Sequence, residues 1–130
     1  MRRLLLLLRL LLTCFFVAAA TAAPLSSAAR TEIDGLLSRL EASACEFNRN
    51  GTWYPAPEAK VHLLHKLKYL EDRGAVQSAE QFIDLAASSS SMSGQAYLVR
   101  CANAAPLASR TWLLEQLQFM RSAAGARKAP

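Results

Sequence analysis

The chain has 130 residues, which is enough for one small domain, and its 52% of hydrophobic residues exclude a disordered protein. The formal net charge is +5, but three of the fifteen basic residues lie within the first nine positions. From residue 23 onward the basic residues outnumber the acidic ones by only two, which argues against a nucleic-acid-binding protein because such proteins present a strongly basic face.

The first 22 residues have the pattern of a secretory signal peptide. A short basic start is followed by an apolar run over residues 4–17 and then by small residues. This run is shorter than the roughly 20 residues that a helix needs to cross a bilayer. We therefore expect cleavage near Ala22, a periplasmic or secreted protein, and no transmembrane segment after the leader is removed.

Removal of the leader also removes Cys14 and leaves Cys45 and Cys101. In an oxidising compartment an even number of cysteines predicts a disulfide, although two buried thiols are the alternative. A bridge across such a long segment stabilises a fold by roughly 4 kcal/mol in the chain-entropy model.

Small residues dominate positions 23–30, which predicts a flexible segment ahead of the folded domain. Thr31 then has the features of an N-cap, with Asp34 three positions later. Apolar residues follow at helical spacing, so we expect a helix over residues 32–43.

The dipeptide Asn50-Gly51 predicts a two-residue hairpin turn, because both central residues of such a turn need a positive φ. Its register pairs Arg49 with Thr52, Asn48 with Trp53 and Phe47 with Tyr54. Cys45 then shares the core face with Phe47 and Tyr54, whereas Trp53 lies on the other face.

A second helix is expected over residues 58–73, because Pro57 suits the first turn of a helix and Gly74 suits the position after its end. Ser78 has the position of the N-cap of a third helix. That helix ends in a hydroxyl-rich loop over residues 88–94.

Residues 96–101 alternate as in a strand, and we expect this strand to pair with the Cys45 hairpin because a disulfide requires close Cα atoms. A fourth helix is expected to be capped by Ser109 and to reach about residue 122, followed by a loose basic tail over residues 123–130. Residues 31–122 would then form a single α+β domain: about four helices packed on a small three-stranded antiparallel sheet, with one disulfide.

Two blocks of residues resemble a known family. They are Cys45-Glu-Phe-Asn-Arg-Asn-Gly with Tyr54, Glu58, His62 and Lys66, and Glu80-Gln-Phe-Ile-Asp-Leu-Ala-Ala with Ser90-Ser-Met-Ser-Gly, Tyr97 and Cys101. Over about residues 31–118 the chain resembles the YfeK-like family of small exported bacterial proteins, a family of unknown function. The resemblance implies an exported bacterial protein with a Cys45–Cys101 bridge and implies no known activity. Ala96 departs from the pattern, since proline is expected there.

Glu58, His62 and His65 lie close together on the second predicted helix, as the ligands of a helical metal site do. No fourth ligand and no recognised zinc motif accompanies them. The simpler interpretation is a polar helix edge, so we expect neither a metal nor another cofactor.

A hydrolase is the enzymatic alternative, with His62 as the base and Ser91 or Ser93 as the nucleophile. The Gly-x-Ser-x-Gly elbow that presents such a serine is absent from the sequence. The residues therefore favour a protein without catalytic activity.

The loop over residues 88–94 offers hydroxyl and backbone N–H groups that, with Arg49 or Lys66, suit an anion or a sugar. The simpler interpretation is that its serines bond to their own backbone. Trp53 is either a contact for a ligand or partner, or is packed against a helix end. The candidate binding surface comprises Arg49, Asn50, Trp53, His62, Ser91, Ser93 and Gly94.

Three functions remain open, and we expect the first. It is a small exported, non-catalytic protein that binds an unknown small ligand or an envelope protein. The second is a small periplasmic hydrolase, and the third is a structural accessory of the envelope without a ligand site. An enzyme needs His62 within hydrogen-bond reach of a loop hydroxyl, whereas a binding protein needs Arg49 and Trp53 exposed beside a concavity.

Overall fold

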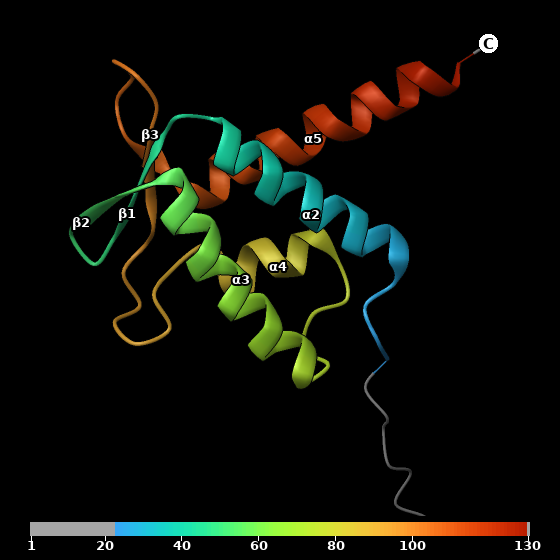
Figure 1. The fold of residues 1–130 in the computed structure, drawn as a ribbon, viewed down its shortest axis with the longest axis horizontal. Coiled ribbons are helices and arrows are strands. Elements are labelled where there is room, and N and C mark those ends of the chain that lie inside the picture. Colours follow the sequence, from blue (N-terminus) through green and yellow to red (C-terminus); the bar gives the residue numbers. More distant parts are fainter. Residues whose placement is uncertain (1–22, 130) are drawn as a thin grey trace, which may run out of the picture.

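The computed structural model describes residues 23–129, so the predicted signal peptide lies outside the described residues. Within this range four helices and a four-stranded antiparallel sheet form an α+β fold (Figure 1). The strand order is β2-β1-β3-β4. The predicted fold class is therefore confirmed, but the expected number of three strands was wrong.

The first described helix, α2 (Ser27–Ala42), begins five residues earlier than predicted. Ser26 is its N-cap, because the Ser26 hydroxyl accepts a hydrogen bond from the backbone N–H of Ala29 at 3.2 Å. Thr31 lies inside the helix and donates its hydroxyl to the carbonyl of Ser27. The end of the segment predicted to be flexible is thus helical.

Strands β1 (Glu46–Arg49) and β2 (Thr52–Pro55) form the predicted hairpin. Its register is confirmed: Phe47 pairs with Tyr54, Asn48 with Trp53 and Arg49 with Thr52. Asn50 and Gly51 have φ values of 52° and 85°, as a tight two-residue turn requires.

Strand β3 (Leu98–Arg100) pairs antiparallel with β1, as predicted, and sets Val99 opposite Phe47. The fourth strand, β4 (Leu107–Ala108), pairs with the other edge of β3. Two residues are too few to show an alternating pattern, so the sequence carried no signal for this strand.

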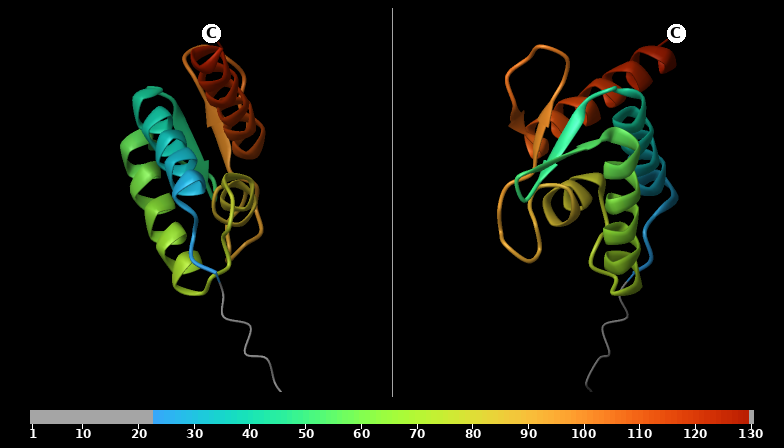
Figure 2. Two further views of the ribbon diagram at one scale, coloured as in Figure 1. Left: turned by 90° about the vertical axis from the view of Figure 1, so that its right-hand side faces the viewer. Right: turned by 60° about the vertical axis from the view of Figure 1, so that its left-hand side comes forward.

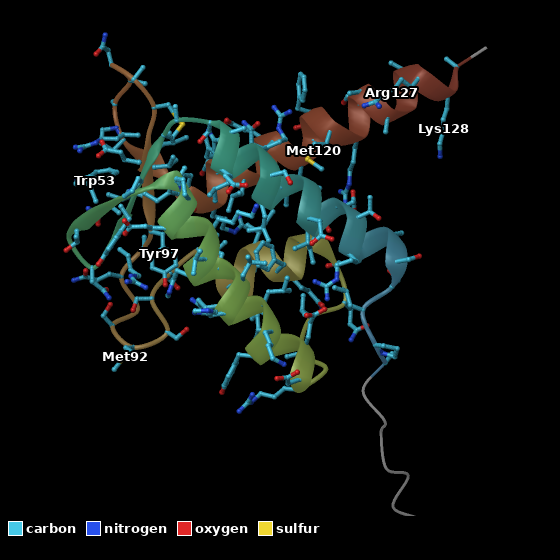
Figure 3. The ribbon with its side chains drawn as sticks, in the orientation of Figure 1. Trp53, Met92, Tyr97, Met120, Arg127 and Lys128 are labelled. Carbon is cyan, nitrogen blue, oxygen red and sulfur yellow. A yellow bond between two sulfur atoms is a disulfide. The ribbon has the colours of Figure 1, made fainter. Side chains whose placement is uncertain are left out.

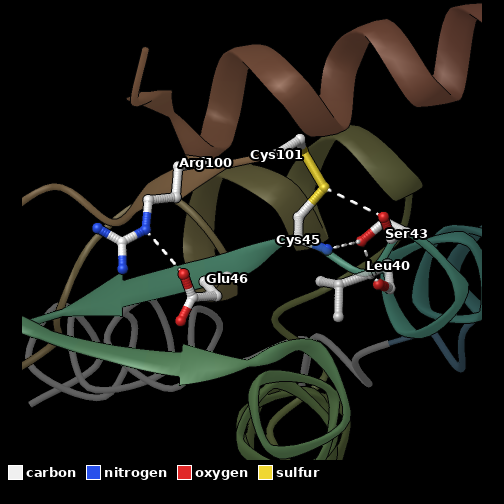
Figure 4. Close-up of a disulfide and its surroundings, with 6 residues drawn as sticks. All are labelled: Leu40, Ser43, Cys45, Glu46, Arg100 and Cys101. Carbon is white, nitrogen blue, oxygen red and sulfur yellow. Dashed lines mark hydrogen bonds and ion pairs between the residues drawn. A yellow bond between two sulfur atoms is a disulfide. The ribbon is translucent and has the colours of Figure 1, made fainter. Parts of the chain in front are cut away.

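The predicted disulfide joins Cys45 to Cys101, whose Cα atoms lie 4.3 Å apart (Figure 4). Next to it, Glu46 pairs with Arg100 in the β1–β3 ladder and accepts a hydrogen bond from its Nε at 2.8 Å. The two cysteines continue the same register by one residue. The bridge therefore holds the register of β1 against β3, and a slip by one residue would move every side chain to the opposite face.

Helix α3 (Ala56–Asp72) begins two residues before its predicted start. Gly74 follows its end with a φ of 60°, as expected of a glycine after a helix. Ser78 is the N-cap of helix α4 (Ala79–Ala86), because its hydroxyl accepts from the N–H of Gln81 at 3.1 Å. That predicted cap is confirmed.

Helix α5 (Ser109–Lys128) is longer than predicted. Ala108 stands at the N-cap position, so Ser109 is the first helical residue and not the cap. Residues 123–128 continue the helix, and the prediction of a loose tail from residue 123 was wrong for them. The last turns of α5 extend away from the strands (Figures 1 and 2).

The hydrophobic core is formed by buried residues from β1, β3 and all four described helices. Helix α3 packs on β1 and β2, α5 packs on β3 and β4, and α2 and α4 pack against both helices. Phe47 meets Trp112 of α5 edge to face, with ring centroids 5.7 Å apart. Of the helices that the structure describes, none is long and apolar enough to cross a membrane.

Candidate functional site

Four polar side chains from three segments meet where the hairpin packs on α3. Arg49 ends β1, and Tyr97, which Figure 3 labels, immediately precedes β3. His62 and Lys66 lie four residues apart on one face of α3. The register that sets Cys45 opposite Cys101 at one end of the ladder sets Arg49 beside Tyr97 at the other. We call Arg49, His62, Lys66 and Tyr97 the cationic cluster.

Hydrogen bonds connect all four members of the cluster. Nη1 of Arg49 lies 2.5 Å from Nδ1 of His62, and Nε2 of His62 lies 3.1 Å from the hydroxyl of Tyr97. Nζ of Lys66 donates to the same hydroxyl at 3.3 Å and to the carbonyl of Ser89 at 3.0 Å. Because a guanidinium only donates, Nδ1 of His62 accepts and its Nε2 carries the proton.

The surroundings of the cluster disfavour additional positive charge. Burial, Arg49, Lys66 and His65 together lower the pKa of His62 to about 4, so this ring is neutral at pH 7. Burial and the neighbouring Arg49 lower the pKa of Lys66 from its usual range. Burial raises the pKa of Tyr97, which is 6% exposed, and Arg49 opposes that change.

Among the described residues, no carboxylate forms an ion pair with a member of the cluster. Within residues 23–129 the ion pairs involve other basic residues, and neither Arg49 nor Lys66 takes part in one. Both side chains are nevertheless partly buried. The guanidinium of Arg49 also lies over the ring of Tyr54, with its Cζ 4.8 Å from the ring centroid.

Among the hollows that border the cluster, two share Arg49, Tyr54, His62 and Tyr97. The larger, here called the cationic pocket, has a volume of about 360 Å³ and is completed by Asn50, Thr52, Lys66, Ser90, Ser91 and Met92. The smaller, here called the apolar pocket, has a volume of about 100 Å³ and is completed by Phe47, Asn48, Glu58, Ala59, Leu63 and Ser109.

The loop over residues 88–94, here called the serine loop, is built largely from its own hydrogen bonds. The Ser90 hydroxyl, in a residue only 6% exposed, accepts from the N–H groups of Met92 and Ser93 at 3.3 Å. The N–H of Gly94 bonds to the carbonyl of Ser90, and that of Gln95 to the hydroxyl of Ser93. These N–H groups are therefore occupied and do not form the predicted cradle for an anion.

Asn50 anchors this loop to the hairpin. Its Nδ2 donates to the Ser90 hydroxyl at 3.3 Å, and its Oδ1 accepts from the Ser93 hydroxyl at 2.6 Å. Ser91 is exposed at the border of the cationic pocket. Gly94 has a φ of 73° and provides a turn. Met92 is 98% exposed at the tip of the loop (Figure 3).

Trp53 lies apart from the other predicted surface residues. It is directly opposite Asn48, one residue away from Arg49 along β1, so the two side chains point to opposite faces of the hairpin. On its own face Trp53 is covered by Arg100, whose Cζ lies 4.0 Å from the ring centroid. The predicted single surface of Arg49, Trp53 and the serine loop is therefore divided between two faces.

The hydrolase and metal arrangements are not assembled. Both ring nitrogens of His62 are engaged by Arg49 and Tyr97, and neither Ser91 nor Ser93 bonds to this ring. Across residues 23–129 there is no group of three side chains placed to hold a metal ion.

Tyr97 and Ser90 are the site residues that the sequence reasoning missed, and Lys66 was considered only as a counter-charge. A signal for Lys66 and for Tyr97 exists in retrospect. Lys66 follows His62 by four residues on a helix, and Tyr97 shares the parity of Val99 and Cys101, which marks the face toward α3. The Ser90 side chain gave no such signal.

Residues 27–121 match the model of a family of unknown function, DUF5329, and this segment runs from the start of α2 into α5. No curated protein and no solved structure matches the chain. The match covers most of the 130 residues and includes every member of the cationic cluster. The chain therefore belongs to the family of unknown function DUF5329.

Proposed function

We propose that this protein is a small exported, non-catalytic binding protein that holds a small anion in the cationic pocket. One observation carries the proposal: Arg49 bonds to the ring of His62 and Lys66 bonds to the hydroxyl of Tyr97 beside it, so the two cations converge. Both side chains are partly buried, and neither has a carboxylate partner among residues 23–129. Removing charge from water costs free energy unless a counter-charge compensates it. A bound anion supplies that counter-charge.

The hydrogen-bond pattern leaves donors for such an anion. The Tyr97 oxygen accepts from His62 and from Lys66, so its own hydrogen is left to donate. Only one N–H of the Arg49 guanidinium is engaged by His62. Together with the ammonium of Lys66, these groups present hydrogen to the pocket and no negative charge, which favours an anion over a neutral sugar.

The exported setting is part of the proposal and rests on three features. They are the signal-peptide pattern of the first 22 residues, the resemblance to the YfeK-like exported bacterial proteins, and the disulfide between Cys45 and Cys101. A disulfide persists most readily in an oxidising compartment, so the bridge and the leader support the same location.

Isothermal titration of the exported, disulfide-bonded protein with acetate and with inorganic phosphate tests the binding. We expect at least one of these anions to bind, and Arg49→Gln or Lys66→Gln to weaken its binding by about 10-fold to 100-fold, as expected for a lost charge-assisted hydrogen bond. Arg73→Gln is the matched control, because Arg73 stacks on Tyr69 at the far end of α3.

The thermal midpoint of each variant separates binding from folding. Lys66 also bonds to the carbonyl of Ser89, so Lys66→Gln is expected to lower the midpoint slightly while the protein remains folded. If neither anion binds the wild-type protein, or if Arg49→Gln binds as tightly as Arg73→Gln does, the cationic cluster has a structural role and the proposal is overturned.

A further inference from the structure

We propose that the ligand is a small monocarboxylate whose short apolar group occupies the apolar pocket while its carboxylate meets Arg49, Lys66 and Tyr97. This inference rests on the proposed function and specifies the chemistry of the ligand. It follows from the position of the apolar pocket, which shares Arg49, Tyr54, His62 and Tyr97 with the cationic pocket.

The lining of the apolar pocket indicates the kind of group that enters it. Apart from the shared residues, its apolar walls are made by Phe47, Ala59 and Leu63, of which Phe47 and Leu63 belong to the hydrophobic core. The polar residues that complete its lining are Asn48, Glu58 and Ser109. A hollow of this kind favours hydrocarbon over water. The cationic cluster at its border would bind one end of a ligand and the apolar pocket the other.

The volume limits the size of the apolar group. A cavity of about 150 Å³ accommodates benzene in another protein, whereas the apolar pocket has about 100 Å³. An aliphatic group of about four carbons fits, and an aromatic ring or a long chain does not. Butyrate and isovalerate have the appropriate size.

The available donors favour a carboxylate as the head group. The guanidinium of Arg49 retains further N–H groups beside the one that bonds to His62, and a planar fork of this kind matches the two oxygens of a carboxylate. Glu58 borders the same apolar pocket, so its negative charge opposes a second carboxylate on the ligand. A monocarboxylate therefore fits better than a dicarboxylate.

A titration series with the wild-type protein tests the inference, using acetate, butyrate, isovalerate, octanoate, succinate and the neutral amide isovaleramide. Each methylene that enters the pocket strengthens binding by about 4-fold, so butyrate, with two more methylenes, should bind about 15-fold more tightly than acetate. Isovalerate should bind like butyrate or better, and octanoate and succinate should bind more weakly than butyrate. Isovaleramide, which lacks the charge, should show no measurable binding.

A variant that fills the pocket locates the apolar group. Ala59→Leu places a larger side chain at the wall of the apolar pocket on a helix that accepts leucine. It should abolish the preference for isovalerate over acetate. Ala126→Leu, at an exposed position of α5, is the matched control and should leave both affinities unchanged.

The outcomes separate this inference from the proposed function. Equal affinities for acetate and isovalerate in the wild-type protein would overturn the apolar pocket as a subsite, and binding of phosphate without any carboxylate would overturn the head group. In both cases anion binding would stand. Failure of both acetate and phosphate to bind would overturn the proposed function itself. The wild-type series is decisive even if Ala59→Leu does not fold.

Discussion

Arg49 donates a hydrogen bond to Nδ1 of His62, and this 2.5 Å contact joins the end of β1 to the middle of α3. Because a guanidinium has no lone pair to offer, the contact requires an unprotonated Nδ1. The other nitrogen, Nε2, then donates to Tyr97. A neutral His62 thus links Arg49 to Tyr97 through two hydrogen bonds. Protonation of the ring would place a second positive charge directly beside the guanidinium of Arg49.

Because His62 is neutral in the folded protein, we expect the fold to lose stability in acid. Its pKa of about 4 in the folded protein lies below the value of 6.5 for an exposed histidine, so the unfolded chain binds the extra proton first as the pH falls. The stabilisation is complete above about pH 6.5 and is lost progressively toward pH 4. The charged or titratable groups that act on the ring are Arg49, Lys66 and His65.

Thermal unfolding of the wild-type protein and of His62→Gln between pH 7 and pH 4.5 measures this effect. Glutamine retains a donor and an acceptor but does not titrate. The ring is partly exposed, so after allowance for solvent screening we expect the wild-type midpoint to fall by about 4–8 °C more than that of the variant, equivalent to about 1 kcal/mol. Parallel curves would show that His62 does not couple folding to pH.

Asn50 is predicted to hold the serine loop against the hairpin. Asn50→Gly keeps a turn that needs a positive φ but removes the bonds to Ser90 and Ser93. Hydrogen exchange at the amides of Met92 and Ser93 should become about fivefold faster, since about 1 kcal/mol of local stability is lost. Asn50→Ala should lose the same bonds and a further 1–2 kcal/mol, roughly, through backbone strain. Unchanged exchange in Asn50→Gly would mean that the loop holds itself.

The Cys45–Cys101 bridge is predicted to stabilise both the fold and the site. The double variant Cys45→Ser/Cys101→Ser should lose roughly 4 kcal/mol of stability, which corresponds to a midpoint lower by about 15 °C or more. Because the bridge holds the register that sets Arg49 beside Tyr97, affinity for acetate or phosphate should also fall. Ser43→Ala is a control at the same place, since it removes the hydroxyl that bonds to Leu40 but keeps the bridge (Figure 4). A double variant with wild-type stability would contradict this role.

Export is predicted from the leader. After expression of the full chain in a bacterium, intact mass of the periplasmic protein should correspond to a start near Ala23, less two hydrogen atoms for the bridge. Leu7→Arg places a charge within the apolar run and should leave the uncleaved chain in the cytoplasm. Cleavage in that variant as efficient as in the wild type, or retention of the wild type in the cytoplasm, would argue against a signal peptide.

Most features that depend on a few neighbouring residues could be predicted. The Asn50-Gly51 turn determines its own backbone angles, and the Ser78 cap depends on an N–H three residues away. The hairpin register followed directly from the turn. Thr31 shows the limit of such reasoning, because Ser26 offers an equally good N-cap. The earlier start is selected by packing of the first turn of α2, in which Ala29 is buried.

The sequence by itself determined the α+β class, the hairpin and its two faces, and the bridge between Cys45 and Cys101. Turn chemistry and alternation are local properties, and only two cysteines follow residue 22. Only the tertiary structure decided that β4 adds to the sheet, that α5 reaches Lys128, and that the cationic cluster forms. Arg49, His62 and Tyr97 are separated by up to 48 positions, and their meeting depends on how α3 packs across β1 and on the register that β3 adopts beside it. Both are long-range contacts that depend on burial of the whole core, so no short segment of the chain predicts them.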